Sequence, residues 1–229
     1  MQNKLFFLSM IGMAAAGPTK RAYYNYLKNN TCLTAPEVAK DSTWLPNAPV
    51  TDDVVGSNGG VPMFVDVGIM DTTTCQAMTD VLVEIWSPNA VGDYESNSLR
   101  GAQLTDQNGI AEIQTIFPGF TSDGANHVNV IVHRPGVTSP EGVSTVAHVG
   151  QLFFTDKWTE VVSIDSGIAP YNGNTNTRTL NNNDPNFIQA STNAYYPVLD
   201  IEDIQDDWPA GVTAYITIGI NPDAEYSLD

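Results

Sequence analysis

Three histidines, His127, His133 and His148, are the side chains best suited to metal binding or to acid–base chemistry. An imidazole can bind a metal or exchange a proton near neutral pH. His127, Asn129 and His133 alternate with valines, so in a β-strand they would share one face. His127 and His133 are six residues apart, about 20 Å along an extended strand, which is too far for them to bind one ion.

Other chemistry has little support in the sequence. There is no G-x-S-x-G nucleophile elbow, zinc motif, P-loop or dinucleotide fingerprint. The acidic residues at 200–207 could bind Ca²⁺, but they lack EF-hand spacing and its glycine, which favours a solvated loop. The net charge is −17 with nine Lys and Arg, which argues against nucleic acid and anionic membranes as partners. These features indicate an acidic extracellular protein kept soluble by charge repulsion.

The elements that would position these side chains are short strands. Alternating apolar residues predict strands at 61–69, 81–85, 128–132, 146–154 and 212–220. Gly150 marks a bulge or a close approach, and Asn108-Gly109 carries the hairpin signal. Residues 56–60 and 172–183 are expected to be loops. Without long helical periodicity, this pattern predicts an all-β protein, a two-sheet antiparallel β-sandwich.

The N-terminus predicts a secretory signal peptide at residues 1–16, with Lys4, an apolar run and three alanines. The run is shorter than the roughly 20 residues that span a bilayer; the alternative is an interfacial helix. An N-terminal arm or short helix at 17–31 and one domain at 32–229 would follow. In a secreted chain Cys32 and Cys75 suggest a disulfide, the alternative being two buried thiols. Asn29 begins an N-glycosylation sequon.

Seven segments, in order, resemble those of the secreted, fungal-type intradiol ring-cleavage dioxygenase-like proteins. They are C-L-T-A-P-E at 32–37, G-V-P at 60–62, T-C at 74–75 with the strand at 81–86, G-D-Y at 92–94, L-R-G-A-Q-L-T-D at 99–106, T-I-F-P-G at 115–119 and H-V-G-Q-L-F-F at 148–154. The resemblance implies a β-sandwich and, in the family, a ferric ion held by two tyrosinates and two histidines, on which catechols are cleaved.

The family's iron-binding pattern P-G-x-Y-x-G-R-x-x-H-I-H aligns without a gap on residues 118–129. By this resemblance Tyr94 and His127 keep two ligand positions, whereas Thr121 and Asn129 stand where the family has tyrosine and histidine. Gly124 replaces an arginine that helps to place substrate. Two further residues of the matching segments, Arg100 and Gln103, are candidate pocket residues.

These substitutions predict a pseudoenzyme without a cofactor, because a neutral hydroxyl and an amide are poor ligands for Fe³⁺. Such a protein would bind an aromatic or glycan ligand in the former cleft. Two alternatives stay open: a structural protein that self-assembles as a homo-oligomer, coat or fibre through its sheet edges, and an active dioxygenase with an altered metal site, for instance from Tyr94, His127 and Asp123.

Overall fold

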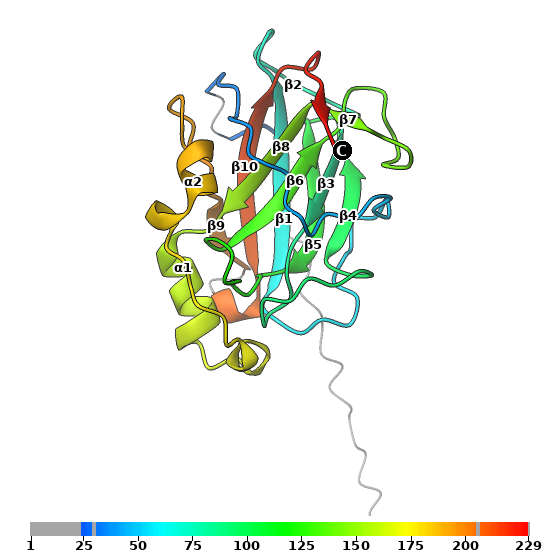
Figure 1. The fold of residues 1–229 in the computed structure, drawn as a ribbon. Helices are drawn as coiled ribbons and strands as arrows, with labels where there is room; N and C mark the ends of the chain where they lie inside the picture. Colours follow the sequence, from blue (N-terminus) through cyan, green and yellow to red (C-terminus); the bar gives the residue numbers. More distant parts are fainter. Residues whose placement is uncertain (1–23, 29–30, 205–206, 229) are drawn as a thin grey trace, which may run out of the picture.

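Two β-sheets face each other in the computed structural model, which describes residues 24–28, 31–204 and 207–228 (Figure 1). The first sheet has the order β4 (Arg100–Leu104), β3 (Leu82–Trp86), β6 (His127–Val132) and β8 (His148–Phe153). The second has the order β2 (Gln76–Ala77), β1 (Pro62–Asp71), β10 (Val212–Ile220) and β9 (Asp200–Asp203), and β5 (Ile110–Ile116) also pairs with β1. Two short strands, β7 (Thr145–Val146) and β11 (Tyr226–Ser227), pair separately. The predicted β-sandwich is confirmed.

The core lies between the sheets, and the alternation in the sequence selects the side chains that form it. In β6, Val128, Val130 and Val132 are buried in the main cluster between the sheets. The opposite face of β6 carries His127 and Asn129, which are also buried. This outer face is therefore covered as well, and polar side chains on it are enclosed by other parts of the chain.

One strand pair departs from the predicted antiparallel arrangement. The two longest strands, β1 and β10, run parallel, with Val67 opposite Ile216. Parallel partners need a long connection, and here almost the whole domain lies between them. Alternation is the same for either direction, so it could not reveal this pairing.

The Asn108-Gly109 turn forms, but it does not make a hairpin. Gly109 has φ 77°, and Gly109 N donates to Asp106 O at 3.0 Å. The strands on either side, β4 and β5, belong to different sheets. The turn therefore carries the chain across the sandwich. Gly150 marks a close approach, since a Cβ there would lie 2.5 Å from His148 Nε2.

A strap of residues 32–54 crosses the outer face of the β4-β3-β6-β8 sheet and follows the edges of both sheets. Val38 N donates to Val149 O of β8 at 3.1 Å, Thr51 N to Ala102 O of β4 at 2.9 Å, and Val54 N to Gln114 O of β5 at 3.0 Å. Two further outer strands lie in the second sheet: β9, which exposes Asp200 and Asp203, and β2, which is only two residues long.

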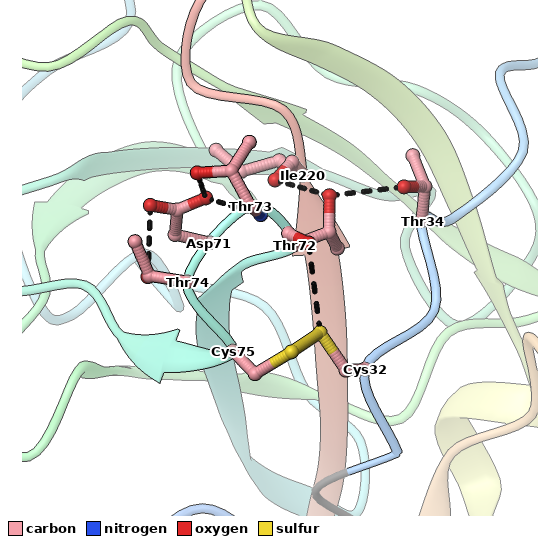
Figure 2. Close-up of a disulfide and its surroundings, with 8 residues drawn as sticks. All are labelled: Cys32, Thr34, Asp71, Thr72, Thr73, Thr74, Cys75 and Ile220. Carbon is pink, nitrogen blue, oxygen red and sulfur yellow. Dashed lines mark hydrogen bonds between the residues drawn. A yellow bond between two sulfur atoms is a disulfide. The ribbon is translucent and has the colours of Figure 1, made fainter.

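The disulfide Cys32–Cys75 is present and ties the start of this strap to the turn between β1 and β2 (Figure 2). Beside it, Thr34 Oγ1 donates to Thr72 Oγ1 at 3.0 Å, and Thr72 Oγ1 donates to Ile220 O at 3.0 Å. The predicted glycosylation site Asn29 and the predicted leader lie outside the described residues.

Short helices interrupt the region between β8 and β9. They are α1 (Asp156–Glu160) continued by a π-helical turn (Val161–Asp165), 3₁₀ turns at Ala169–Gly173 and Asn181–Asn183, and α2 (Pro185–Ala190). A further 3₁₀ turn, Trp208–Ala210, precedes β10. Asp184 caps α2 and Pro185 occupies its first turn, the usual signals of a helix start. Within the described part of the chain, no helix has the length and apolar character needed to cross a membrane.

The acidic cluster at 200–207 is partly ordered into a strand rather than a loop. Asp200 to Asp203 form β9, and Glu202 pairs with Lys28 at 2.6 Å. Asp206 lies outside the described residues. Among the residues that are described, no three His, Cys, Asp or Glu side chains gather in a way that could hold a metal ion.

Candidate functional site

Four of the residues singled out in the sequence, Tyr94, Thr121, Gly124 and His127, line one small cavity of about 110 Å³. The cavity lies between β6, the loop that precedes it, the strap, and the start of α2. Asn129 does not line the cavity, but it is hydrogen-bonded to Tyr94, which does. The structure therefore brings together all five positions that align with the family's iron ligands and its arginine.

Asn129 is the centre of a hydrogen-bond chain across the cavity wall. Its Nδ2 donates to Tyr94 Oη at 3.0 Å, and its Oδ1 accepts from Gln151 Nε2 at 3.2 Å. Asn129 on β6 lies opposite Gln151 on β8 in the sheet register, which places the two amides side by side. Both are almost fully buried, at 1% and 3% exposure. Because a buried amide is costly without partners, this chain fixes Tyr94 in place.

His127 has one ring nitrogen bonded and one free. Nδ1 lies 2.7 Å from Ala125 O. A carbonyl oxygen only accepts hydrogen bonds, so Nδ1 carries the proton and Nε2 of the neutral ring keeps a lone pair. Nε2 is buried and has no hydrogen-bond partner among the described residues. The ring also contacts Phe153, with centroids 5.5 Å apart. His127 thus presents an acceptor in a fixed orientation.

Thr121 is engaged in its own loop. It is partly exposed, and its Oγ1 accepts from Asp123 N at 3.3 Å. This is a local side-chain turn of the kind that threonine often makes. The hydroxyl is neutral, so it brings no negative charge to the cavity.

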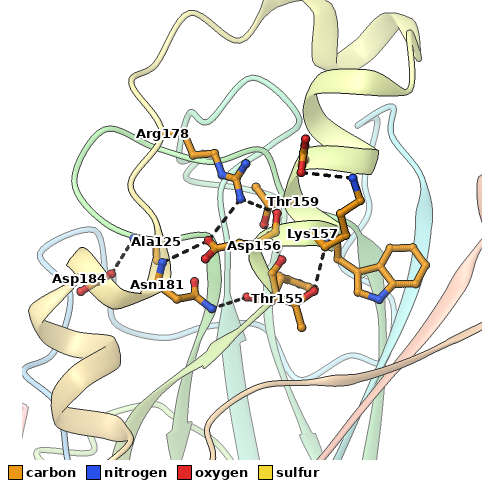
Figure 3. Close-up of polar contacts among 11 residues, drawn as sticks. Ala125, Thr155, Asp156, Lys157, Thr159, Arg178, Asn181 and Asp184 are labelled. Carbon is orange, nitrogen blue, oxygen red and sulfur yellow. Dashed lines mark hydrogen bonds and ion pairs between the residues drawn. The ribbon is translucent and has the colours of Figure 1, made fainter.

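Gly124 stands where the chain passes very close to α2. A Cβ at this position would lie 2.8 Å from Asp184 Oδ2. That carboxylate accepts from Ala125 N at 2.6 Å (Figure 3), and its other oxygen accepts from Asn186 N at 2.7 Å at the start of α2. Asp184 is buried and held on both sides. Glycine is therefore the residue that fits at position 124, because it has no Cβ to collide with the Asp184 carboxylate.

Gly124→Ala is expected to destabilise the protein by about 1–3 kcal/mol, the usual cost of overpacking. The added methyl group meets a carboxylate that cannot withdraw without giving up its bonds to Ala125 and α2. Urea denaturation measures the loss. Gly136→Ala is the control for an added methyl group, because no atom lies within 4 Å of a Cβ at that position. Any loss of stability in this control comes from its positive φ and not from a close contact. A Gly124→Ala variant as stable as the parent would contradict the close approach.

Arg100 and Gln103 lie outside this cavity. The Arg100 guanidinium donates to Leu45 O at 2.8 Å, beneath the strap. Burial lowers the pKa of Arg100, and the negative charge of nearby Glu84 opposes this effect. Gln103 lies on β4 opposite Val83. Arg100 thus supports the strap and does not reach the residues around Tyr94.

The cavity is acidic. Asp41, Asp123 and Asp184 are among its lining residues, and no lysine or arginine is. Burial, and after it the negative charge of Asp41, raises the pKa of Tyr94, so this phenol resists ionisation. A cavity of this kind disfavours anionic ligands.

Sequence reasoning did not select Gln151, Asp41 or Asp184. Gln151 lies within the matched H-V-G-Q-L-F-F segment, and its register opposite Asn129 was the signal that could have found it. Asp184 precedes Pro185, a helix-start signal. No local sequence pattern marks Asp41, because it reaches the cavity only through the path that the strap takes across the sheet.

The same two-sheet arrangement occurs in several solved structures. The fold is similar to that of an intradiol ring-cleavage dioxygenase from Tetranychus urticae, with 24% sequence identity, a TM-score of 0.70, and coverage of 84% of this chain and 96% of that one. It is also similar to the dioxygenase domain of a dioxygenase–carbohydrate-binding protein fusion from Streptomyces sp. SirexAA-E, with 20% identity, a TM-score of 0.58, and coverage of 81% and 97%. A hydroxyquinol 1,2-dioxygenase from Pseudomonas putida DLL-E4 matches with 15% identity, a TM-score of 0.55, and coverage of 82% and 66%.

No family model matches the chain, and no curated protein matches its sequence. The structural likeness identifies the architecture. This chain has the fold of the intradiol ring-cleavage dioxygenases.

Proposed function

We propose that this intradiol dioxygenase-like protein does not hold ferric iron, does not cleave catechols, and binds a small ligand in the cavity beside His127. The hydrogen-bond chain from Gln151 through Asn129 to Tyr94 is the observation that carries this proposal. In this chain the neutral amide of Asn129 donates a hydrogen bond to the hydroxyl of Tyr94, the residue that aligns with a ligand tyrosine of the family.

The donor set does not fit a ferric ion of the family's kind. Fe³⁺ is a hard cation that favours anionic oxygen ligands. The raised pKa of Tyr94 disfavours tyrosinate, and Asn129 donates a hydrogen bond to the same oxygen. Thr121 adds a neutral hydroxyl. His127 alone, with its Nδ1 bonded to a backbone carbonyl, has the form of a metal-binding residue.

The free groups favour a neutral ligand that donates hydrogen bonds. His127 Nε2 and Gln151 Oε1 are buried, and neither has a partner among the described residues. Three carboxylates line the cavity, and no lysine or arginine lies among its lining residues to offset them. An uncharged phenol or polyol satisfies both free acceptors, whereas a catecholate dianion meets repulsion.

Iron content and ring cleavage test the proposal together. Protein purified from iron-rich medium is expected to hold far less than one iron per chain and to bind catechol without cleaving it. The double variant Thr121→Tyr with Asn129→His restores two ligand types, and its iron affinity is expected to rise by more than about 10-fold, since even supporting groups change metal affinity by 10–100-fold.

The matched control is Thr121→Phe with Asn129→Leu, which brings similar bulk but no donor atoms. It is expected to bind no more iron than the parent. Stoichiometric iron together with ring cleavage in the unaltered protein would overturn the proposal and favour the active dioxygenase with an altered metal site.

We also propose that the protein is secreted. The disulfide supports this, because such bonds persist in oxidising compartments. The edges of the sheets argue against assembly by strand addition: residues 49–54 cover β4 and β5, β9 exposes carboxylates, and β2 is only two residues long. A homo-oligomer stays a prediction, for which light scattering is the measurement.

A further inference from the structure

Two hollows on the surface share the residues Tyr196 and Thr155, and each encloses about 380 Å³. One is bounded by β9 and β10, with Asp200 and Tyr215 in its wall. The other is bounded by the 3₁₀ turn Asn181–Asn183 and by α2. Each lies within the range of small-molecule sites, about 300–1,000 Å³. Tyr196 lies between them as a ridge, and we call the whole feature the Tyr196 groove.

Tyr196 is presented on a fixed segment. It is 64% exposed. Its neighbour Tyr195 donates from Oη to Thr217 O at 3.0 Å, and Leu199 N donates to Phe153 O at 2.8 Å. The segment is thus bonded to both sheets, through the side chain of Tyr195 on one side of Tyr196 and through the backbone of Leu199 on the other. A large, exposed aromatic side chain on a rigid support loses little entropy when it binds a partner.

The wall of the groove is built by polar groups that already have partners (Figure 3). Thr155 Oγ1 accepts from Trp158 N at 3.1 Å, and Asp156 Oδ1 accepts from Asn181 N at 3.2 Å. Asn181 Nδ2 in turn donates to Phe154 O at 2.9 Å. These bonds fix the shape of the wall and leave these groups little capacity for a ligand.

Other polar groups in the groove are available. Ser191 Oγ is buried and has no hydrogen-bond partner among the described residues. Asn182 lines the same hollow with an exposed amide, and Asp200 lines the other with an exposed carboxylate. Lys28 also lines the hollow that contains Asp200, where its charge is paired with Glu202 at 2.6 Å. The groove therefore offers one aromatic face flanked by a hydroxyl, an amide, a carboxylate and a paired ammonium group.

This combination matches the two surfaces of a sugar ring. The C–H groups on one face of a pyranose are apolar and can lie against an aromatic ring, while its hydroxyl groups donate to carboxylate and amide oxygens. We propose that the Tyr196 groove binds a neutral oligosaccharide, with one sugar stacked on Tyr196 and its neighbours in the two hollows. The net charge of −17 and Asp200 disfavour an acidic polysaccharide.

The groove is separate from the cavity beside His127, although both use α2. Asp184 and Asn186 line the cavity at the start of the helix, whereas Phe187 and Ser191 line the groove. The groove and the cavity thus share no lining residue.

Calorimetric titration of the full chain tests this inference. The probes are the β-1,4-linked hexamers of glucose, xylose, mannose and N-acetylglucosamine, with oligogalacturonate as the acidic comparison. At least one neutral hexamer is expected to bind, and oligogalacturonate is not. Tyr196→Ala is expected to weaken binding by roughly 10-fold or more, the effect of losing a central aromatic anchor, while Tyr196→Trp keeps it.

Tyr26→Ala is the matched control, because Tyr26 is 65% exposed and lies outside the groove. Its affinity is expected to equal that of the parent, as is that of the Thr121→Tyr, Asn129→His variant. Thermal unfolding confirms that each variant is folded. Absence of binding to all four neutral hexamers, or equal binding by Tyr196→Ala and the parent, overturns the inference.

Discussion

Glu84→Ala is expected to lower the free energy of unfolding by about 2–5 kcal/mol, because it leaves two buried hydrogen-bond donors without their acceptor, each at a cost of about 1–3 kcal/mol. Glu84 is 1% exposed. Its Oε2 lies 3.1 Å from His133 Nε2, and its Oε1 accepts from Trp44 Nε1 at 2.9 Å. Alanine leaves both nitrogens buried without this acceptor, and it removes a charge that interacts with Arg100.

The effect should reach the candidate site, because Trp44 belongs to the strap that lines the cavity. Trp86 Nε1 donates to Thr43 Oγ1 at 3.1 Å, and Asp41 Oδ1 accepts from Thr43 N at 2.7 Å. Both Thr43 and Asp41 line the cavity. Releasing Trp44 therefore loosens one wall, and hydrogen exchange of residues 41–45 is expected to become faster in the variant.

Urea denaturation measures the change in stability. Glu84→Gln keeps an acceptor for Trp44 and is expected to lose less than Glu84→Ala. Glu141→Ala, at an exposed position, is the control and should stay within about 0.5 kcal/mol of the parent. If Glu84→Ala loses less than about 1 kcal/mol, the pair with His133 contributes little and the argument fails.

Replacing Cys32 and Cys75 by serine is expected to cost about 4 kcal/mol. The bond joins residues that are 43 apart in the sequence, and the chain-entropy model gives roughly this value for a loop of that length. Most of the loss arises in the unfolded chain, which gains freedom when the loop opens.

The folded strap should keep its place without the disulfide. Ala35 N donates to Gly219 O at 2.8 Å, and Thr34 and Thr72 remain bonded beside the former bridge (Figure 2). Comparing urea denaturation of the parent with and without reductant gives the same quantity independently. Thr34→Ala, which removes one exposed hydrogen bond, should cost less than about 1 kcal/mol. A midpoint unchanged by reductant would refute the prediction.

Much of the fold could be predicted from the sequence, since period-two alternation marks the strands. Val128, Val130 and Val132 face the core as expected. Alternation does not carry strand direction, so the parallel β1–β10 pair was missed. The hairpin predicted at Asn108-Gly109 was wrong because the turn type is local, whereas the choice of sheet depends on distant strands. The helices are too short to show a period.

The site was predicted in part. Resemblance placed Tyr94, Thr121, Gly124 and His127, and the structure gathers them around one cavity. It also proposed Arg100 as a pocket residue, whereas the Arg100 guanidinium lies outside the cavity and donates a hydrogen bond to Leu45 O of the strap. It did not select Gln151, whose role follows from register across two strands. Whether the cavity binds iron stays a prediction for the measurements above.

The contact between Gly124 and Asp184 bears on how this protein could change over time. The Asp184 carboxylate lies 2.8 Å from where the Cβ of a side chain at position 124 would lie, so a bulky residue such as arginine does not fit there while Asp184 caps α2. The two positions are therefore expected to change together among descendants of a common ancestor: a bulky residue at one should accompany a smaller residue, or a displaced helix, at the other. A single substitution at position 124 would lower stability unless position 184 changed as well, which makes the present arrangement hard to alter one residue at a time.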